Sequence, residues 1–273
     1  MKSLEEFNRY LLSEEKSALT REKYLRDVMA FLQWLDRRRI TKDTVLAYKT
    51  DLIGRYAPAS VNSILSSVNS YLRFCGMEHC RVKTLKQQRE VFCPEEKELS
   101  WKEYQRLLRA AENDQRLWLL MQTICATGIR VSEHRFITVE AARLGRATVR
   151  GKGKLRTVFL PRKLCTALLR YSMEKGIRSG SVFVTSGGRP LDRSRIWALM
   201  KRLCSAANVR KEKVFPHNLR HLFARIYYGE EKDIVRLADI LGHSSINTTR
   251  IYTRESGEVH RKQIEKMPLL FIT

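Results

Sequence analysis

Apolar residues between Leu4 and Phe74 recur at the spacing of amphipathic helices. One face of the segment 20–35 carries a stripe of apolar side chains: Tyr24, Val28, Phe31, Leu32 and Leu35. Positions i, i+3 and i+4 share one side of an α-helix, so this stripe predicts a helix with one buried face. Further helix starts are indicated at Thr41 and at Ala57, which Pro58 follows. We therefore predict a small all-α domain of four short helices over residues 1–76.

The helical periodicity stops after Gly76, and residues 77–98 are predicted to link two domains. Pro94 interrupts this segment. Four basic residues also crowd one part of it: Arg81, Lys83, Lys86 and Arg89. Such a cluster is typical either of a segment that follows a nucleic-acid backbone or of a solvated loop. The sequence leaves both interpretations open.

Residues 99–273 are predicted to form a second domain that begins with helices. Ser100 and Glu103 form a capping box, in which the two side chains satisfy free N–H groups at a helix start. The segment 117–126 is almost entirely apolar, which predicts a buried helix, and Gly128 is expected to end it. Three later helices are predicted, from Pro161 to about Lys175, from Asp192 to Ala207 and from about Glu258 to Lys266.

Two segments of this second domain have the pattern of β-strands. Residues 147–150 and 156–160 flank the turn sequence G-K-G-K-L, which predicts a hairpin with lysines at its tip. Another short strand is predicted over residues 182–184. The predicted fold class is therefore mainly α with a small β-sheet.

The charge of the chain narrows the choice of partner. There are 52 lysine and arginine residues against 29 aspartate and glutamate residues, a formal net charge of +23. A charge this large indicates a polyanionic partner, with nucleic acid ahead of an acidic membrane. No apolar run approaches the roughly 18 residues of a membrane span, and the amino terminus lacks an apolar signal core. The six cysteines form no C-x-x-C pair, so we expect reduced thiols in a cytoplasmic protein.

Candidate chemistry is concentrated between residues 215 and 253, which contain F-P-H-N-L-R-H, L-G-H-S and I-Y-T. His217, Arg220 and His221 would share one face of a helix that begins at the proline. An imidazole and a guanidinium on one face can hold a single phosphate group. Tyr252 adds a phenol, which becomes a nucleophile when its proton is removed.

Arg130 supplies a second arginine, in the sequence T-G-I-R-V-S-E directly after the buried helix. A buried arginine needs an anionic partner, which Glu133 or a ligand can supply. Each of these patterns alone is also typical of a solvated helix face, a loop or ordinary core packing. Their combination along one chain indicates chemistry on a phosphate.

With these motifs in this order, the chain resembles the tyrosine site-specific recombinases of the phage integrase and Xer family, nearly from end to end. The resemblance implies a helical core-binding (SAM-like) DNA-binding domain over 1–76, a basic linker over 77–98, and an α+β catalytic domain with a C-terminal docking tail over 99–273. It also implies six catalytic residues: Arg130, Lys152, His217, Arg220, His243 and Tyr252.

The implied reaction is attack of Tyr252 on a DNA phosphodiester, which gives a 3′-phosphotyrosine and a free 5′-hydroxyl. His217 is the candidate base, while Arg130 and Arg220 would stabilise the two non-bridging oxygens. His243 would donate to the same phosphate, and a lysine of the hairpin would protonate the departing oxygen. Because the covalent link retains the bond energy, neither a metal nor ATP is expected as a cofactor.

The hairpin departs from the family pattern. The family often has G-K-G-x-K-x-R, whereas G-K-G-K-L-R here is one residue shorter. The G-K-G match assigns the general acid to Lys152, with Lys154 as the alternative. We recognise no extra amino-terminal domain like the arm-binding domain of the larger integrases, so we expect a simple, Xer-like or small mobile-element recombinase.

The resemblance also implies the partners. These are double-stranded DNA, a homo-tetramer on two duplexes in which the apolar tail 267–273 is exchanged between protomers, and an accessory DNA-bending or directionality factor. The expected location is cytoplasmic and nucleoid-associated, with no membrane partner. Two alternative functions are a type IB topoisomerase-like enzyme and a non-catalytic DNA-binding regulator with this fold.

Overall fold

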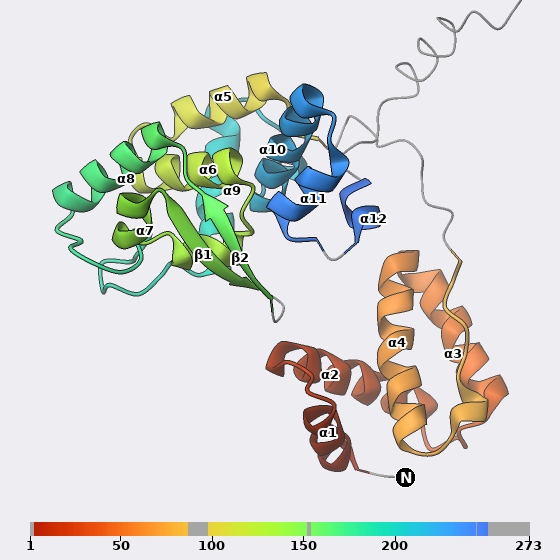
Figure 1. Cartoon of the computed structure of the whole chain (residues 1–273). Coiled ribbons are helices and arrows are strands. Elements are labelled where there is room, and N and C mark those ends of the chain that lie inside the picture. Colours follow the sequence, from red (N-terminus) through yellow and green to blue (C-terminus); the bar gives the residue numbers. More distant parts are fainter. Residues whose placement is uncertain (1–2, 87–97, 152–153, 244, 251–273) are drawn as a thin grey trace, which may run out of the picture. The chain divides into compact units, whose positions relative to one another are not determined.

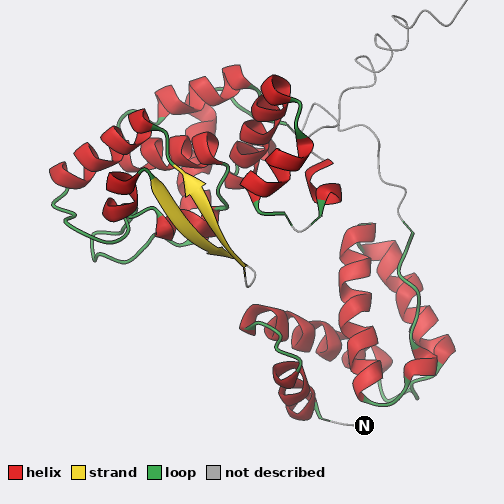
Figure 2. Ribbon diagram, in the orientation of Figure 1, coloured by secondary structure: helices red, strands yellow, loops and turns green. Residues whose placement is uncertain are grey.

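The computed structural model describes residues 3–86, 98–151, 154–243 and 245–250. Its internal contacts divide the chain into two compact units, 1–89 and 90–273 (Figure 1). The sheet in Figure 2 is a single two-stranded hairpin, so the described residues have the predicted fold class, mainly α with a small β-sheet.

The first unit contains the four predicted helices: α1 (Leu4–Ser13), α2 (Ala18–Leu35), α3 (Lys42–Arg55) and α4 (Pro58–Phe74). Ser3, Ser17 and Thr41 accept hydrogen bonds from the first turns of α1, α2 and α3, and proline occupies the first turn of α4. α2 and α4 pack against each other. Apolar side chains between α2, α3 and α4 form the main core, which includes Phe31, Val45, Leu52, Val61 and Leu65.

The first part of the predicted linker packs on this unit. After the 3₁₀ helix η1 (Glu78–Cys80), two asparagines of α4 hold the following segment through their side-chain amides. Asn69 accepts from the amide of Val82 over 3.0 Å and donates to its carbonyl over 2.8 Å. Asn62 pairs with the backbone of Leu85 in the same way, over 2.7 and 3.0 Å. Residues 82–85 are therefore fixed along α4.

The second unit has helices on a larger core and one hairpin. Its α-helices are α5 (Trp101–Ala110), α6 (Gln115–Thr127), α7 (Val139–Leu144), α8 (Arg162–Glu174), α9 (Arg193–Ala206), α10 (Pro216–Glu231), α11 (Ile234–Leu241) and α12 (Ile246–Thr249). Two 3₁₀ helices, η3 (Val131–Phe136) and η4 (Lys211–Lys213), lie between them. The capping box of Ser100 and Glu103 is confirmed, and α6 packs against α8, α9 and α10. α6 is therefore the central element from which the site is built.

Strands β1 (Arg146–Gly151) and β2 (Lys154–Phe159) form the predicted antiparallel hairpin. In β1 the apolar positions 147 and 149 are buried, while the alternate positions are exposed. The predicted strand over 182–184 is wrong, because residues 181–184 take part only in isolated bridges, Thr138 to Ser181 and Val184 to Pro190. Without a neighbouring strand in register, the segment cannot extend the sheet. The predicted helix over 258–266 lies outside the described residues.

Candidate active site

The end of α6 sets the position of Arg130. Gly128 caps this helix in the left-handed conformation, with φ of +63°. A Cβ at this position would lie 2.5 Å from Cδ1 of Phe223, so both the conformation and the space require glycine. The chain then enters η3, for which Arg130 is the N-cap residue. Arg130 thus projects from the end of a rigid, buried helix, as the sequence predicts.

Glu133 holds Arg130 by two hydrogen bonds. Nη1 of Arg130 donates to Oε1 of Glu133 over 3.0 Å, and the backbone amide of Arg130 donates to Oε2 over 2.8 Å. The carboxylate is 2% exposed, whereas the Arg130 side chain is 29% exposed. The guanidinium therefore has a buried anchor on one side and an accessible edge. This confirms the expectation that Glu133 supports Arg130.

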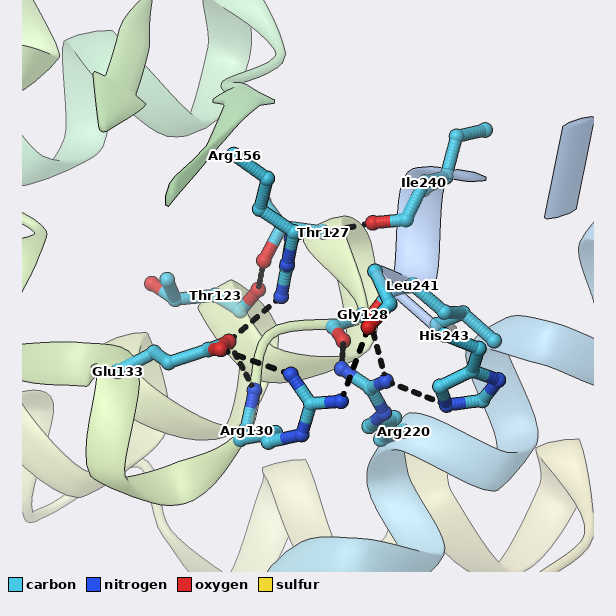
Figure 3. Close-up of polar contacts among 11 residues, drawn as sticks. Thr123, Thr127, Gly128, Arg130, Glu133, Arg156, Arg220, Ile240, Leu241 and His243 are labelled. Atoms are coloured by element: carbon cyan, nitrogen blue, oxygen red, sulfur yellow. Dashed lines mark hydrogen bonds and ion pairs between the residues drawn. The ribbon is translucent and has the colours of Figure 1, made fainter. Parts of the chain in front are cut away.

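The same carboxylate binds a second arginine, Arg156 of β2. Nη2 of Arg156 lies 2.6 Å from Oε2 of Glu133 (Figure 3). Nη1 of Arg156 donates to the carbonyl of Ile240 over 3.0 Å, near the end of α11. Nη2 of Arg130 reaches the carbonyl of Gly242 over 3.3 Å. Both arginines are therefore tied to one carboxylate and to the C-terminal end of α11, where Gly242 is the capping residue.

Arg220 is a buried charged group of the site, as is Glu133. Its side chain lies inside the second unit, with 1% of the residue exposed. Nη1 donates to the carbonyl of Gly128 over 2.5 Å, and Nη2 donates to the carbonyl of Leu241 over 2.7 Å. Arg220 thus connects the C-terminal ends of α6 and α11 through their free carbonyls, which cations favour.

His243 completes this connection. Nη2 of Arg220 and Nε2 of His243 are 2.9 Å apart, and Nδ1 of His243 is 2.9 Å from Oγ1 of Thr249. A guanidinium can only donate, so Nε2 accepts and a neutral ring carries its proton on Nδ1. Burial, with the charges of Arg220, Arg130 and Arg156, lowers the pKa of His243 to about 4. The ring is therefore neutral at pH 7.

His217 lies one turn before Arg220 on α10, beside His221. The two imidazole rings are 4.5 Å apart between centroids and nearly perpendicular, at 72°. Partial burial, then the charges of Arg220, Arg130 and Arg193, lower the pKa of His217. Burial and the neighbouring His217 lower the pKa of His221 to about 3. Both rings are neutral at pH 7, so His217 is in the protonation state that a base requires.

Between these elements is a cavity of about 170 Å³. It is lined by Arg130, Glu133, Gly151, Leu155, Arg156, Asp239, Gly242 and His243. Around it the guanidinium groups of Arg130, Arg156 and Arg220 outnumber the carboxylates of Glu133 and Asp239. An excess of fixed positive charge with accessible N–H donors suits an oxyanion. The cavity therefore suits an anion such as a phosphate group.

The structure brings together three of the six predicted site residues, Arg130, Arg220 and His243, with His217 on the same helix as Arg220. Lys152 and Tyr252 lie outside the described residues. For the alternative lysine, Lys154, the structure describes the backbone pairing with Gly151. The assignment of the general acid and of the nucleophile stays a prediction.

Two residues that contact this group, Arg156 and Thr249, were not predicted from the sequence. Position 156 alternates with the exposed Leu155 and shares a strand face with the buried Val158. An arginine on the buried face of a hairpin needs an anion, and this signal was available in the sequence. Thr249 has no comparable signal, because only the packing of α12 against α11 brings it to His243.

The five cysteines that the structure describes are free thiols, and no cluster of metal-ligating side chains occurs among the described residues. Within the same residues, no helix has the length and apolar character needed to cross a bilayer.

Comparisons with known proteins cover both units. Residues 97–258 match the model of the phage integrase family, and residues 4–79 match the phage integrase N-terminal SAM-like domain. Tyrosine recombinase XerA of Pyrococcus furiosus is 30% identical, over 98% of this chain and 94% of its own length.

Two solved structures share the fold. XerH site-specific recombinase bound to its difH substrate aligns with a TM-score of 0.73 and 20% identity, over 96% of this chain and 83% of that one. A lambda integrase tetramer bound to a Holliday junction aligns with a TM-score of 0.72 and 20% identity, over 93% of this chain and 78% of that one.

Proposed function

Because this chain belongs to the phage integrase family of tyrosine recombinases, we propose that it cuts and rejoins DNA at specific sites through a 3′-phosphotyrosine intermediate. One observation of the site itself supports this proposal. Arg130 and Arg220, which are far apart in sequence, both bind carbonyls at the end of α11, and His243 accepts from Arg220 at the same place. Such a group of donors suits a phosphodiester in the transition state of its cleavage.

The reaction exchanges one phosphate ester for another. The Oη atom of Tyr252 attacks phosphorus, and its proton passes to His217. The lowered pKa of His217 keeps this ring unprotonated, which a proton acceptor requires. The bond from phosphorus to the 5′ oxygen breaks, and Lys152 gives this oxygen a proton. Arg130 and Arg220 stabilise the charge that grows on the non-bridging oxygens. The reverse sequence rejoins the strands.

The role of His243 requires an exchange of hydrogen bonds. Its Nε2 accepts from Arg220, so it cannot donate to a phosphate from that atom while this bond persists. Donation requires the proton on Nε2, with the phosphate in place of the guanidinium as its partner. In the described arrangement, His243 instead orients Arg220 through a bond that fixes one edge of the guanidinium.

We propose that the substrate is double-stranded DNA, contacted by both units. The net charge of +23 supports binding to the phosphate backbone, with an affinity that falls steeply as salt rises. The proposed organisation has one DNA-binding domain at each end of a linker: the domains are 1–76 and 99–273, and the linker is 77–98. The proposed location is the cytoplasm, with the nucleoid.

We propose that the active assembly is a homo-tetramer on two duplexes, with residues 267–273 exchanged between protomers. A lambda integrase of the same fold forms a tetramer on a Holliday junction, which supports this assembly. An accessory DNA-bending or directionality factor would act on it. The recombinase names of the relatives favour strand exchange over the two alternative functions. The biological role is either integration and excision of a mobile element or Xer-like resolution.

The test is covalent trapping on DNA. A duplex is prepared from the DNA that flanks the gene, with a nick just beyond the cleavage site. The short fragment that carries the new 5′-hydroxyl then dissociates after cleavage, and the adduct cannot be resealed. The wild-type protein should form an adduct that migrates more slowly on denaturing gels. Tyr252→Phe should bind the duplex equally well and form none, because only the phenolic oxygen is lost. Tyr227→Phe and Tyr228→Phe are matched controls on α10. If one of these variants forms no adduct, the nucleophile is assigned to that tyrosine instead.

A further inference from the structure

Arg156 of β2 is held between two parts of the site that come from distant segments. It pairs with Val149 in the hairpin, on the strand face that points toward the core. Its side chain is 14% exposed. Its two terminal nitrogens bind different partners: Nη2 contacts Glu133 beside Arg130, and Nη1 contacts the carbonyl of Ile240 in α11. One planar guanidinium therefore bridges Glu133, which supports Arg130, and α11, the helix that precedes His243.

The turn after α11 is built around this side chain. Gly242 has φ of +65°, and a Cβ there would lie 2.4 Å from Cδ and 2.7 Å from Nε of Arg156. The backbone of Gly242 thus touches the aliphatic part of Arg156, and its carbonyl accepts from Arg130. His243 follows directly. The place of this turn, and with it His243, depends on a side chain that the hairpin supplies.

Arg156 also affects which N–H donor Arg130 directs toward the cavity. Glu133 uses Oε1 for the guanidinium of Arg130 and Oε2 for Arg156. A carboxylate can accept a guanidinium on both oxygens at once, in a bidentate pair. Arg156 and the backbone amide of Arg130 together fill Oε2, so this bidentate pairing with the Arg130 guanidinium is blocked. Nη2 of Arg130 is left for the carbonyl of Gly242, at the edge of the cavity.

We propose that Arg156 is a positioning residue for DNA cleavage, which holds Arg130 and the His243 turn in register with the hairpin. The inference rests on the proposed function and deepens it. The hairpin tip carries Lys152, the proposed general acid, so the same bridge links the leaving-group side of the reaction to the phosphate-binding side. A change in the hairpin would then alter phosphate binding and proton donation together.

The test compares Arg156→Met and Arg156→Lys with Arg146→Met in the trapping assay. Arg146 is an exposed arginine at the other end of the same hairpin, so it controls for loss of a cation from this element. Arg156→Met should retain DNA binding and lower the single-turnover cleavage rate by about 10². The cleavage rate of Arg156→Lys should fall between those of the wild type and Arg156→Met, because an ammonium keeps the charge but lacks the rigid fork that reaches both partners. Arg146→Met should cleave within about twofold of the wild type.

A double variant distinguishes positioning from a general loss of structure. Because Arg156 acts through Arg130 as well as through the His243 turn, the double variant Arg130→Ala with Arg156→Met should be less impaired than the product of the two single defects, since the effects of interacting residues are not additive. Two defects that multiply in the double variant would overturn the proposal. So would normal cleavage by Arg156→Met, or by Arg156→Lys if the Met variant does not fold. A wild-type protein that forms no adduct would overturn both the positioning role and the proposed function. A slow Arg156 variant beside an active wild type supports both.

Discussion

The guanidinium of Arg220 donates a hydrogen bond to the imidazole of His243, with Nη2 and Nε2 separated by 2.9 Å. Arg220 lies on α10, and His243 follows the end of α11. The contact fixes the acceptor on His243 and leaves Nδ1 to bond Thr249 of α12. Three elements of the chain are thus joined by one line of polar contacts. The two residues, both proposed to bind the phosphate, therefore form a unit, and a change in either one affects the position of the other.

The two arginines of the site should respond differently to removal. Arg130→Ala and Arg220→Ala are both expected to lower cleavage by at least about 10², because each removes a donor to the transition state. From sequence, both changes are expected to leave the fold intact. For Arg220 the structure revises that expectation, since its removal orphans the buried carbonyls of Gly128 and Leu241, at about 1–3 kcal/mol each. Urea melts of both variants, read beside trapping rates, check this, and equal midpoints would contradict it.

The cleavage rate should stay at its high-pH value down to a pH below the ordinary pKa range of histidine. His217 works as a base when unprotonated, and its pKa is lowered by partial burial and by Arg220, Arg130 and Arg193. The rate should therefore fall only as the pH drops through this lowered value. Arg193→Ala removes one of these charges and should shift the acid limb of the single-turnover profile to higher pH. Arg195→Ala, at an exposed position two residues further along α9, is the matched control. An unmoved limb in Arg193→Ala would exclude His217 as the titrating base.

The lysine of the hairpin should become dispensable when the leaving group is made better. Lys152→Ala should not cleave an ordinary duplex, but should cleave one with sulfur at the 5′ bridging position, because a thiolate leaves without protonation. Lys154→Ala provides the comparison, since it pairs with Gly151 at the end of β2. Rescue by sulfur in the Lys154 variant alone would move the role of general acid to that residue.

Deletion of residues 268–273 should separate DNA binding from assembly. The tail contains four large apolar residues, and burial of each is worth roughly 1.5–3 kcal/mol, so it should occupy a groove on a neighbouring protomer. The truncated protein should bind a single site normally and fail to pair two sites, as measured by gel shifts and by recombination between them. Its melting temperature as a free protein is the control. A large fall in that temperature would show that the tail packs on its own domain.

The sequence by itself determined the features that short-range contacts decide. Helix caps such as Thr41, the box of Ser100 and Glu103, and the glycine that ends α6 depend on residues within one turn. The contact of Arg130 with Glu133 is also local, because the two residues are three apart. The hairpin follows from alternation of buried and exposed positions around a short turn.

Tertiary structure alone decided how these local pieces share partners. Glu133 binds Arg156 across 23 positions, and Arg220 reaches the carbonyl of Gly128 across 92. No periodicity specifies such pairs, because they arise when α6, α10, α11 and the hairpin pack together. The same packing buries Arg220, which the helical pattern placed on a face with His217 without indicating its depth. The physical reason is that a side chain's donors are committed only when distant backbone carbonyls and carboxylates arrive within hydrogen-bond distance.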